Sequence, residues 1–375
     1  MFEKLTQLIS SSSLLTKKSN SVLGVDLGAS AIKIVQLRKD HGRAVLETYG
    51  ELSLGPYADL DMGRATNLPP EKLSEALKDV IREANVSTVN CGASIPFSNS
   101  LITLLEMPAV GAQKLASMIP IEARKYIPVP IAEVQLDWFV IPDAEAKYFA
   151  DGPREEASSQ KSLVLLVAIH NETLRRYTEA LQGANLHPSF YEIEIFSSIR
   201  ASVERGTAPV AILDIGAATS KLYIVEFGII RSSHVIAKGS QDITLMLANS
   251  NGIAIAAAEE MKRTLGMLGG QDESSKGTSY AALLTLEFIF MEARRVLANF
   301  QKKHARAISK VFLTGGGATL KGAVEFGKKQ LELEVELANP FSHVQAPAFL
   351  ADVLKEAGPD FSVAMGLALR KLQEQ

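Results

Sequence analysis

The stretch "GVDLGASAIK", Gly24 to Lys33, has a close counterpart in "ILDIGAATSK", Ile212 to Lys221. In both, an apolar run reaches an aspartate, a turn of small residues follows, and a second run with alternating apolar residues begins. This alternation is typical of strands, so each stretch predicts a strand–turn–strand hairpin. The copies are separated by about half the chain, which indicates two similar domains that face each other.

The two turns have the composition of a phosphate-binding loop. Small residues let the backbone approach a ligand closely, and successive N–H groups on one side of a turn bind phosphate oxygens. Two opposed turns would hold a polyphosphate from both sides, and their aspartates would bind Mg²⁺ through its water ligands. The alternative is that each Asp-x-Gly only forms a hairpin turn. The expected residues are Asp26, Gly28, Ala29, Ser30, Lys33, Asp214, Gly216, Ala217, Ala218 and Thr219.

Two further features complete an expected nucleotide site. Gly315, Gly316 and Gly317 follow an apolar run and precede a predicted helix, where bare backbone can lie against a base or ribose. Glu259 and Lys262 are three residues apart in a predicted helix and could hold ribose hydroxyls and the edge of an adenine. The alternative for this last pair is a solvated ion pair on a helix surface.

Composition argues against several other classes of protein. The chain is 47% hydrophobic and 22% charged, as in an ordinary globular protein, and its net charge of −3 gives no electrostatic footprint for nucleic acid. The single cysteine, Cys91, excludes an internal disulfide and fits a reducing compartment. No apolar run approaches the roughly 18 residues of a membrane span, and the N-terminus lacks a secretory pattern. We therefore expect a cytoplasmic protein.

Alternating strand and helix patterns predict an α/β fold with several subdomains. Residues 1–20 are expected to form a flexible tail, or a short helix that contacts a membrane or a partner. Residues 97–163 are rich in proline and end in a polar stretch, which predicts an inserted subdomain with an exposed loop. The other expected units are a first main subdomain at 21–96 and 164–207, a second at 208–242 and 307–375, and a mostly helical one at 243–306.

With these residues in place, the chain resembles the actin, sugar-kinase and heat-shock-chaperone ATPase superfamily, whose three signature loops occur in the same order. Within it, the chain resembles the PilM family of actin-like type IV pilus assembly proteins. The resemblance covers almost everything from Ser21 onward. It is carried by "IEARKYIPVPIAEVQLDW" (Ile121 to Trp138), "LDIGAATSKLYIV", "AEEMKRTLG", "LTGGGATLKG", "LELEVELANPF" and "FSVAMGLALR".

The resemblance implies an actin-like ATPase fold, with two duplicated domains around a nucleotide cleft and an inserted subdomain of the type found in the division protein FtsA. It implies ATP and Mg²⁺ as ligands and, at most, slow hydrolysis. It also implies recruitment to the inner membrane by the N-terminal tail of a PilN-like protein, contacts with other pilus assembly proteins, and self-association.

The PilN-like tail is expected in a groove between the first domain and the inserted subdomain. The helix that carries Ala123, Arg124, Tyr126, Ile127 and Pro128 is expected to form part of the groove wall. The alternative is that Tyr126 and Ile127 pack the core of the insertion, as buried aromatic and aliphatic residues usually do.

Several positions depart from the family pattern in ways that bear on hydrolysis. Ala29 stands where a hydroxyl residue is frequent, and Lys221 replaces a frequent aspartate. Backbone donors still allow phosphate binding, but few residues are placed to activate water. Glu192, in "YEIEIFSSIRA", is the candidate for orienting a water molecule. We therefore expect a nucleotide-sensing scaffold; the alternatives are an FtsA-like filament former of cell division or cell shape, and a small-molecule kinase of the same superfamily.

Overall fold

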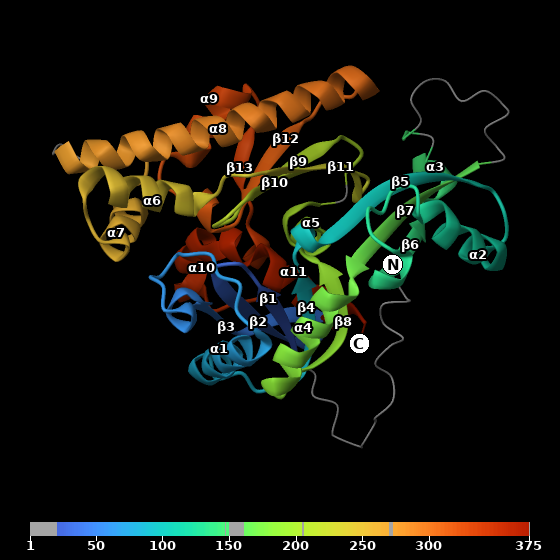
Figure 1. The fold of residues 1–375 in the computed structure, drawn as a ribbon, viewed down its shortest axis with the longest axis horizontal. Helices are drawn as coiled ribbons and strands as arrows, with labels where there is room; N and C mark the ends of the chain where they lie inside the picture. Colours follow the sequence, from blue (N-terminus) through green and yellow to red (C-terminus); the bar gives the residue numbers. More distant parts are fainter. Residues whose placement is uncertain (1–20, 147, 150–160, 205, 270–272, 375) are drawn as a thin grey trace.

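The computed structural model describes residues 21–146, 148–149, 161–204, 206–269 and 273–374, and Figure 1 shows how its elements are arranged. The expected tail at 1–20 lies outside the described residues. Two five-stranded sheets form the two main lobes, and a three-stranded sheet lies beside the first lobe.

The first hairpin is the centre of the first sheet. Its two strands are antiparallel, with Asp26 opposite Lys33, and the strands on the other side of β1 run parallel to it. β1 is buried at every position, as expected for a strand covered on both faces. In sheet order the strands are β3 (Arg43–Ser53), β2 (Ala31–Asp40), β1 (Ser21–Leu27), β4 (Asn90–Ile95) and β8 (His187–Ile193).

The second sheet repeats this topology around the second hairpin. Its antiparallel strands place Asp214 opposite Lys221, and two parallel strands follow on the other side. The predicted duplication is therefore confirmed at the level of strand order and direction. The strands are β11 (Ile229–Ile236), β10 (Ser220–Glu226), β9 (Val210–Ile215), β12 (Lys310–Thr314) and β13 (Val335–Leu337).

The third sheet belongs to the predicted insertion. It is antiparallel, and α2 (Ala112–Ala123) packs on it to form a separate hydrophobic core. The expected boundary at residue 163 is wrong, because it falls inside a strand that remains paired up to His170. A short helix, α3 (Asp143–Ala146), follows β6 in the sequence. The strands, in order, are β5 (Ser100–Pro108), β7 (Lys161–His170) and β6 (Val134–Val140).

Helices cover the main sheets. α1 and α4 pack against each other beside the first sheet, and the long α8 crosses the second sheet beside α9 (Figure 1). α6 and α7 pack with each other and with α8 to one side of that sheet. No helix in the part of the chain that the structure describes has both the length and the apolar character to span a bilayer. The bounds are α1 (Pro70–Glu83), α4 (Asn171–Gly183), α5 (Glu194–Ser202), α6 (Ser240–Asn251), α7 (Ile255–Leu265), α8 (Glu273–His304), α9 (Ala323–Leu331) and α10 (Ala351–Ala357).

The C-terminal helix α11 (Ser362–Gln373) returns to the first lobe, which corrects the expected assignment of 307–375 to the second subdomain. It packs on β1, β4 and α5. Its small residues allow this approach: a Cβ on Gly24 of β1 would lie 1.9 Å from the Ala364 carbonyl oxygen, and a Cβ on Gly366 would lie 2.0 Å from that of Ser197. The C-terminal segment therefore joins the two halves of the molecule.

Candidate functional site

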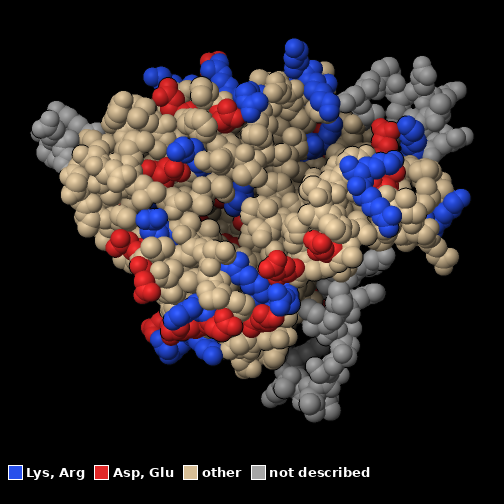
Figure 2. All heavy atoms as spheres, viewed as in Figure 1, with Lys and Arg blue, Asp and Glu red and all other residues tan. Residues whose placement is uncertain are grey.

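A cleft of about 940 Å³ lies between the two main lobes, and both hairpin turns line it. Figure 2 shows a hollow near the middle of one face, with basic and acidic side chains mixed on the surface around it. The structure brings every residue expected at the nucleotide site into this one cleft. They are Asp26, Gly28, Ala29, Ser30, Lys33, Asp214, Gly216, Ala217, Ala218, Thr219, Glu259, Lys262, Gly315, Gly316 and Gly317.

The turns are held through their carbonyl groups. In the first turn, the Ala29 carbonyl accepts a hydrogen bond of 2.8 Å from the Thr66 N–H; in the second, the Ala217 carbonyl accepts one of 3.0 Å from the Gln241 N–H. Because the C=O and N–H of a trans peptide point in opposite directions, the N–H groups of Ser30 and Ala218 point away from these donors. This is the arrangement that a phosphate-binding turn needs.

The two aspartates at the ends of β1 and β9 have different surroundings. Asp26 is buried and accepts a hydrogen bond of 2.8 Å from the Ser94 hydroxyl. Burial raises the pKa of Asp26 to about 6, although the nearby Lys33 ammonium opposes that shift. Asp214 instead receives the Lys221 ammonium, with 3.3 Å between Oδ2 and Nζ. Both carboxylates are buried, but Asp26 is bonded to a hydroxyl whereas Asp214 is paired with an ammonium group.

Lys33 faces Asp26 across the hairpin but pairs elsewhere. Its Nζ lies 2.6 Å from Asp360 Oδ1 and 4.0 Å from Glu51 Oε1. Burial alone would lower the pKa of Lys33, but these carboxylates, with Asp26, raise it above its ordinary value. Lys33 therefore stays charged and connects β2 to the segment that leads into α11.

The three glycines lie where no larger residue fits without movement. Gly315 has φ +81°, and a Cβ there would lie 2.3 Å from Asp214 Oδ1. A Cβ on Gly317 would lie 2.4 Å from Cγ2 of Ile215. The turn therefore packs directly against the end of β9 and brings bare backbone into the cleft.

Glu259 and Lys262 form a buried pair, so the alternative of a solvated helix surface is wrong. Lys262 Nζ and Thr244 Oγ1 each lie 2.7 Å from Glu259 Oε2, and Arg263 Nε lies 2.8 Å from Oε1. Burial raises the pKa of Glu259, but Lys262 and the hydrogen bonds from these partners lower it more, so the net shift is downward. Hydrogen bonds from Thr244, Lys262 and Arg263 thus fix the Glu259 carboxylate.

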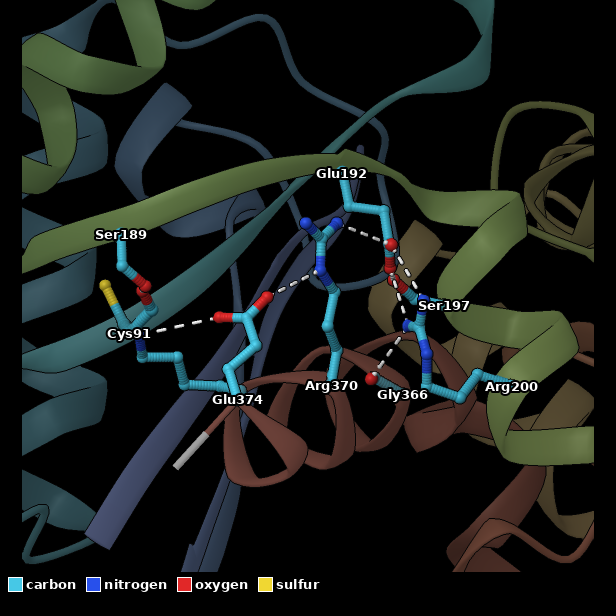
Figure 3. A network of polar contacts seen from close by, with 9 residues as sticks. Cys91, Ser189, Glu192, Ser197, Arg200, Gly366, Arg370 and Glu374 are labelled. Atoms are coloured by element: carbon cyan, nitrogen blue, oxygen red, sulfur yellow. Dashed lines mark hydrogen bonds and ion pairs between the residues drawn. The ribbon is translucent and has the colours of Figure 1, made fainter. Parts of the chain in front are cut away.

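Glu192 lies outside the cleft, so the expectation that it orients a water molecule there is wrong. It is a residue of β8, 4% exposed, and its carboxylate is held between two arginines (Figure 3). Oε1 lies 2.8 Å from Arg370 Nη1, and Oε2 lies 2.7 Å from Arg200 Nη1. Burial raises the pKa of Glu192, but the arginines lower it more. This ion-pair network fastens α11 and α5 to the first sheet.

Glu194, which we did not predict, is the carboxylate that faces the cleft from this region. It begins α5, and its Oε1 accepts a hydrogen bond of 2.6 Å from the Phe97 N–H. The sequence offered one signal for Glu194, a pair of acids two residues apart at the junction of β8 and α5. Glu192 is bound by Arg200 of α5 and by Arg370, which is 178 residues away, and the sequence pattern does not show that these arginines reach Glu192 and not Glu194. Asp360 and Arg263, which also line the cleft, were missed as well.

The expected partner-binding residues are divided between core and surface. α2 ends at Ala123, so the other four residues follow the helix rather than belong to it. Ala123 and Ile127 are buried in the core of the insertion, whereas Tyr126 is 45% exposed and Arg124 and Pro128 are exposed. The alternative of core packing is therefore correct for Ile127 and wrong for Tyr126.

Comparison with known proteins agrees with this architecture. The family described as "Type IV pilus assembly protein PilM" matches residues 24–372. The chain is similar to a solved "PilM-PilN type IV pilus biogenesis complex", with 26% identity and a TM-score of 0.77 over 94% of this chain and 98% of that chain.

Two more distant structures share the fold. The ethanolamine utilization protein EutJ from Carboxydothermus hydrogenoformans is 16% identical, with a TM-score of 0.53 over 96% of this chain and 91% of that one. MreB 5 of Spiroplasma citri, bound to AMPPNP, is 11% identical, with a TM-score of 0.51 over 96% and 98%. The chain has an actin-like α/β fold and belongs to the PilM family of type IV pilus assembly proteins.

Proposed function

We propose that this protein is an ATP-binding scaffold of type IV pilus or related secretion assembly. The observation that carries the proposal is that two opposed hairpin turns, three glycines and the Glu259–Lys262 pair all line one cleft. The turns provide backbone donors for phosphates, and the glycines provide flat backbone for a base or ribose. Cleft closure on ATP would change the relative position of the lobes, because ATP shifts the equilibrium toward whichever form it binds more tightly.

Mg²⁺ fits this cleft only as a partly hydrated ion. Within the described ranges, no group of three or more His, Cys, Asp or Glu side chains could hold a metal directly. Asp26 and Asp214 both line the cleft, and Mg²⁺ in nucleotide sites commonly keeps waters and binds phosphate oxygens. When bound, the ion would neutralise phosphate charge. We propose that Asp26 and Asp214 hold it through its water ligands.

The ATP proposal is tested with Gly316→Val. A Cβ at Gly316 would lie 3.1 Å from Asp360 Oδ1 and would place the valine in the cleft lining. We expect calorimetry to show Mg-ATP affinity at least about tenfold weaker, which corresponds to about 1.4 kcal/mol. Gly111→Val is the control, since a Cβ there has nothing within 4 Å. Full Mg-ATP affinity in Gly316→Val, or no binding by the wild type, would contradict the proposal.

We further propose that the N-terminal tail of a PilN-like inner-membrane protein binds between the insertion and the first lobe. At this junction residues of β7 lie against residues of β8, α5 and α11, among them Ile169, Tyr191 and Phe196. The similar solved structure is a complex of PilM with PilN. This tail would hold the protein, cytoplasmic in itself, at the inner membrane. Other pilus proteins and further copies of the chain are proposed as additional partners.

The tail proposal is tested by fluorescence anisotropy with a labelled partner peptide. Tyr126→Asp changes an exposed side chain of the insertion, and Tyr280→Asp changes an exposed tyrosine of α8 in the other lobe. We expect the first variant to weaken peptide binding and the second to leave it unchanged. Repeating the titration with Mg-ATP tests coupling between the sites, and equal affinities in both states would exclude it.

A further inference from the structure

Lys221 occupies an unusual place in the cleft. Its Nζ lies 3.1 Å from Glu194 Oε2 and 3.3 Å from Asp214 Oδ2. The side chains of all three residues are largely buried, and all three line the cleft. Burial would lower the pKa of Lys221, but the two carboxylates raise it well above its ordinary value. The ammonium group is therefore charged and fixed between them.

Glu194 is a buried carboxylate that lines the cleft beside both turns. It joins the end of β8 to α5, and its charge acts on Asp26 of the first turn, while its Lys221 partner faces Asp214 of the second. Both of its oxygens are already engaged, Oε1 by the Phe97 N–H at 2.6 Å and Oε2 by Lys221. A general base needs a free, basic oxygen within hydrogen-bond distance of the water it activates.

We propose that Lys221 suppresses ATP hydrolysis by holding Glu194. This inference rests on the proposed nucleotide function. In the reaction, a water oxygen bonds to the γ-phosphorus as the bond to the β–γ bridging oxygen breaks. ADP leaves with that electron pair, and Glu194 accepts the water proton and passes it to solvent. The ammonium of Lys221 lies 3.1 Å from Oε2 of Glu194 and so occupies the oxygen that would receive the proton.

In the first hairpin, the lysine opposite the aspartate does not contact Glu194. Lys33 is the counterpart of Lys221, but its ammonium lies 2.6 Å from Asp360 Oδ1, outside the hairpin. The second hairpin sends its lysine toward Glu194 instead. Lys221 is accordingly a positioning residue, which acts through the contact of its ammonium group with Glu194.

The test compares Lys221→Gln, Lys221→Met and Lys221→Arg in single-turnover hydrolysis of Mg-ATP, with AMPPNP affinity measured for each. We expect the two neutral variants to hydrolyse about tenfold faster or more than the wild type, and Lys221→Arg to hydrolyse more slowly than either. Adding Glu194→Gln to Lys221→Gln should remove the gain, because the carboxylate that accepts the proton is then absent. Lys221→Met keeps the chain length if Lys221→Gln fails to fold.

Two outcomes distinguish a failure of the Lys221 proposal from a failure of the proposed nucleotide binding. If the neutral variants bind AMPPNP but hydrolyse ATP no faster than the wild type, Lys221 is not a suppressor, while the nucleotide site stands. If the wild type binds neither AMPPNP nor Mg-ATP, both proposals are overturned.

Discussion

The two hairpins share a sequence pattern and a strand register, yet their aspartates have different partners. In the first, Asp26 takes a hydrogen bond from Ser94 on the neighbouring parallel strand. In the second, Thr314 is the residue paired with Asp214 on the neighbouring strand, but its hydroxyl is buried and makes no hydrogen bond to any described residue. Asp214 turns to Lys221 instead.

The two duplicated hairpins therefore share their backbone arrangement but differ in the charges and hydrogen bonds around their aspartates. The first hairpin leaves a desolvated carboxylate whose pKa is raised to about 6, and such a group gains most from an added cation. The second hairpin neutralises its own carboxylate with a lysine from the same hairpin. The two sides of the cleft therefore differ in the partners of their aspartates although their strand topology matches.

The largest expected effect on stability comes from replacing Gly24 of the first hairpin by a β-branched residue, the kind that the second hairpin has at the corresponding position. Gly24 corresponds to Ile212, and a Cβ at Gly24 would lie 1.9 Å from the Ala364 carbonyl oxygen of α11. Gly24→Val should lower the free energy of unfolding by about 3 kcal/mol or more, because the helix must move away from the strand. Urea denaturation measures this, with Gly111→Val as the control. A change below about 0.5 kcal/mol would show that α11 is not tightly packed on β1.

A smaller effect, of opposite sign, is expected for Asp26→Asn. The pKa of Asp26 lies above that of the unfolded chain, so the native state binds the extra proton between pH 3.8 and about 6, and ionisation above that range costs stability. The variant should gain about 2 kcal/mol at pH 7.5, and the gain should shrink as the pH falls toward 3.8. Asp214→Asn should show no such gain, since Lys221 already compensates that charge. Equal stabilisation by both variants would remove the proposed asymmetry.

The smallest pair of effects concerns the two hydroxyls. Ser94→Ala removes the donor to Asp26 and the acceptor of the Leu27 N–H, so we expect a loss of about 1 kcal/mol in the free energy of unfolding. Thr314→Val removes a buried hydroxyl that has no partner among the described residues, so stability should stay the same or increase slightly. Thermal and urea unfolding of the two variants check this; a larger loss for Thr314→Val would reverse the comparison.

The sequence by itself determined the local parts of this protein. Strand alternation, small turn residues and the three glycines are properties of short segments, and they sufficed to predict both hairpins, the duplicated α/β fold and the residues that meet in one cleft. Longer stretches such as "IEARKYIPVPIAEVQLDW" carried the resemblance to the PilM family, which the match over residues 24–372 confirms.

Only the tertiary structure decided how distant segments meet. Glu192 and Glu194 are two residues apart and chemically alike, and the distant Arg370 joins Arg200 in holding the first in an ion-pair network outside the cleft. The return of α11 to the first lobe depends on the fit of Gly24 to Ala364, and the direction of Lys33 depends on Asp360. Periodicity and propensity describe a residue's near neighbours, whereas these contacts join residues more than 150 positions apart, so their outcome depends on the folding of the whole chain.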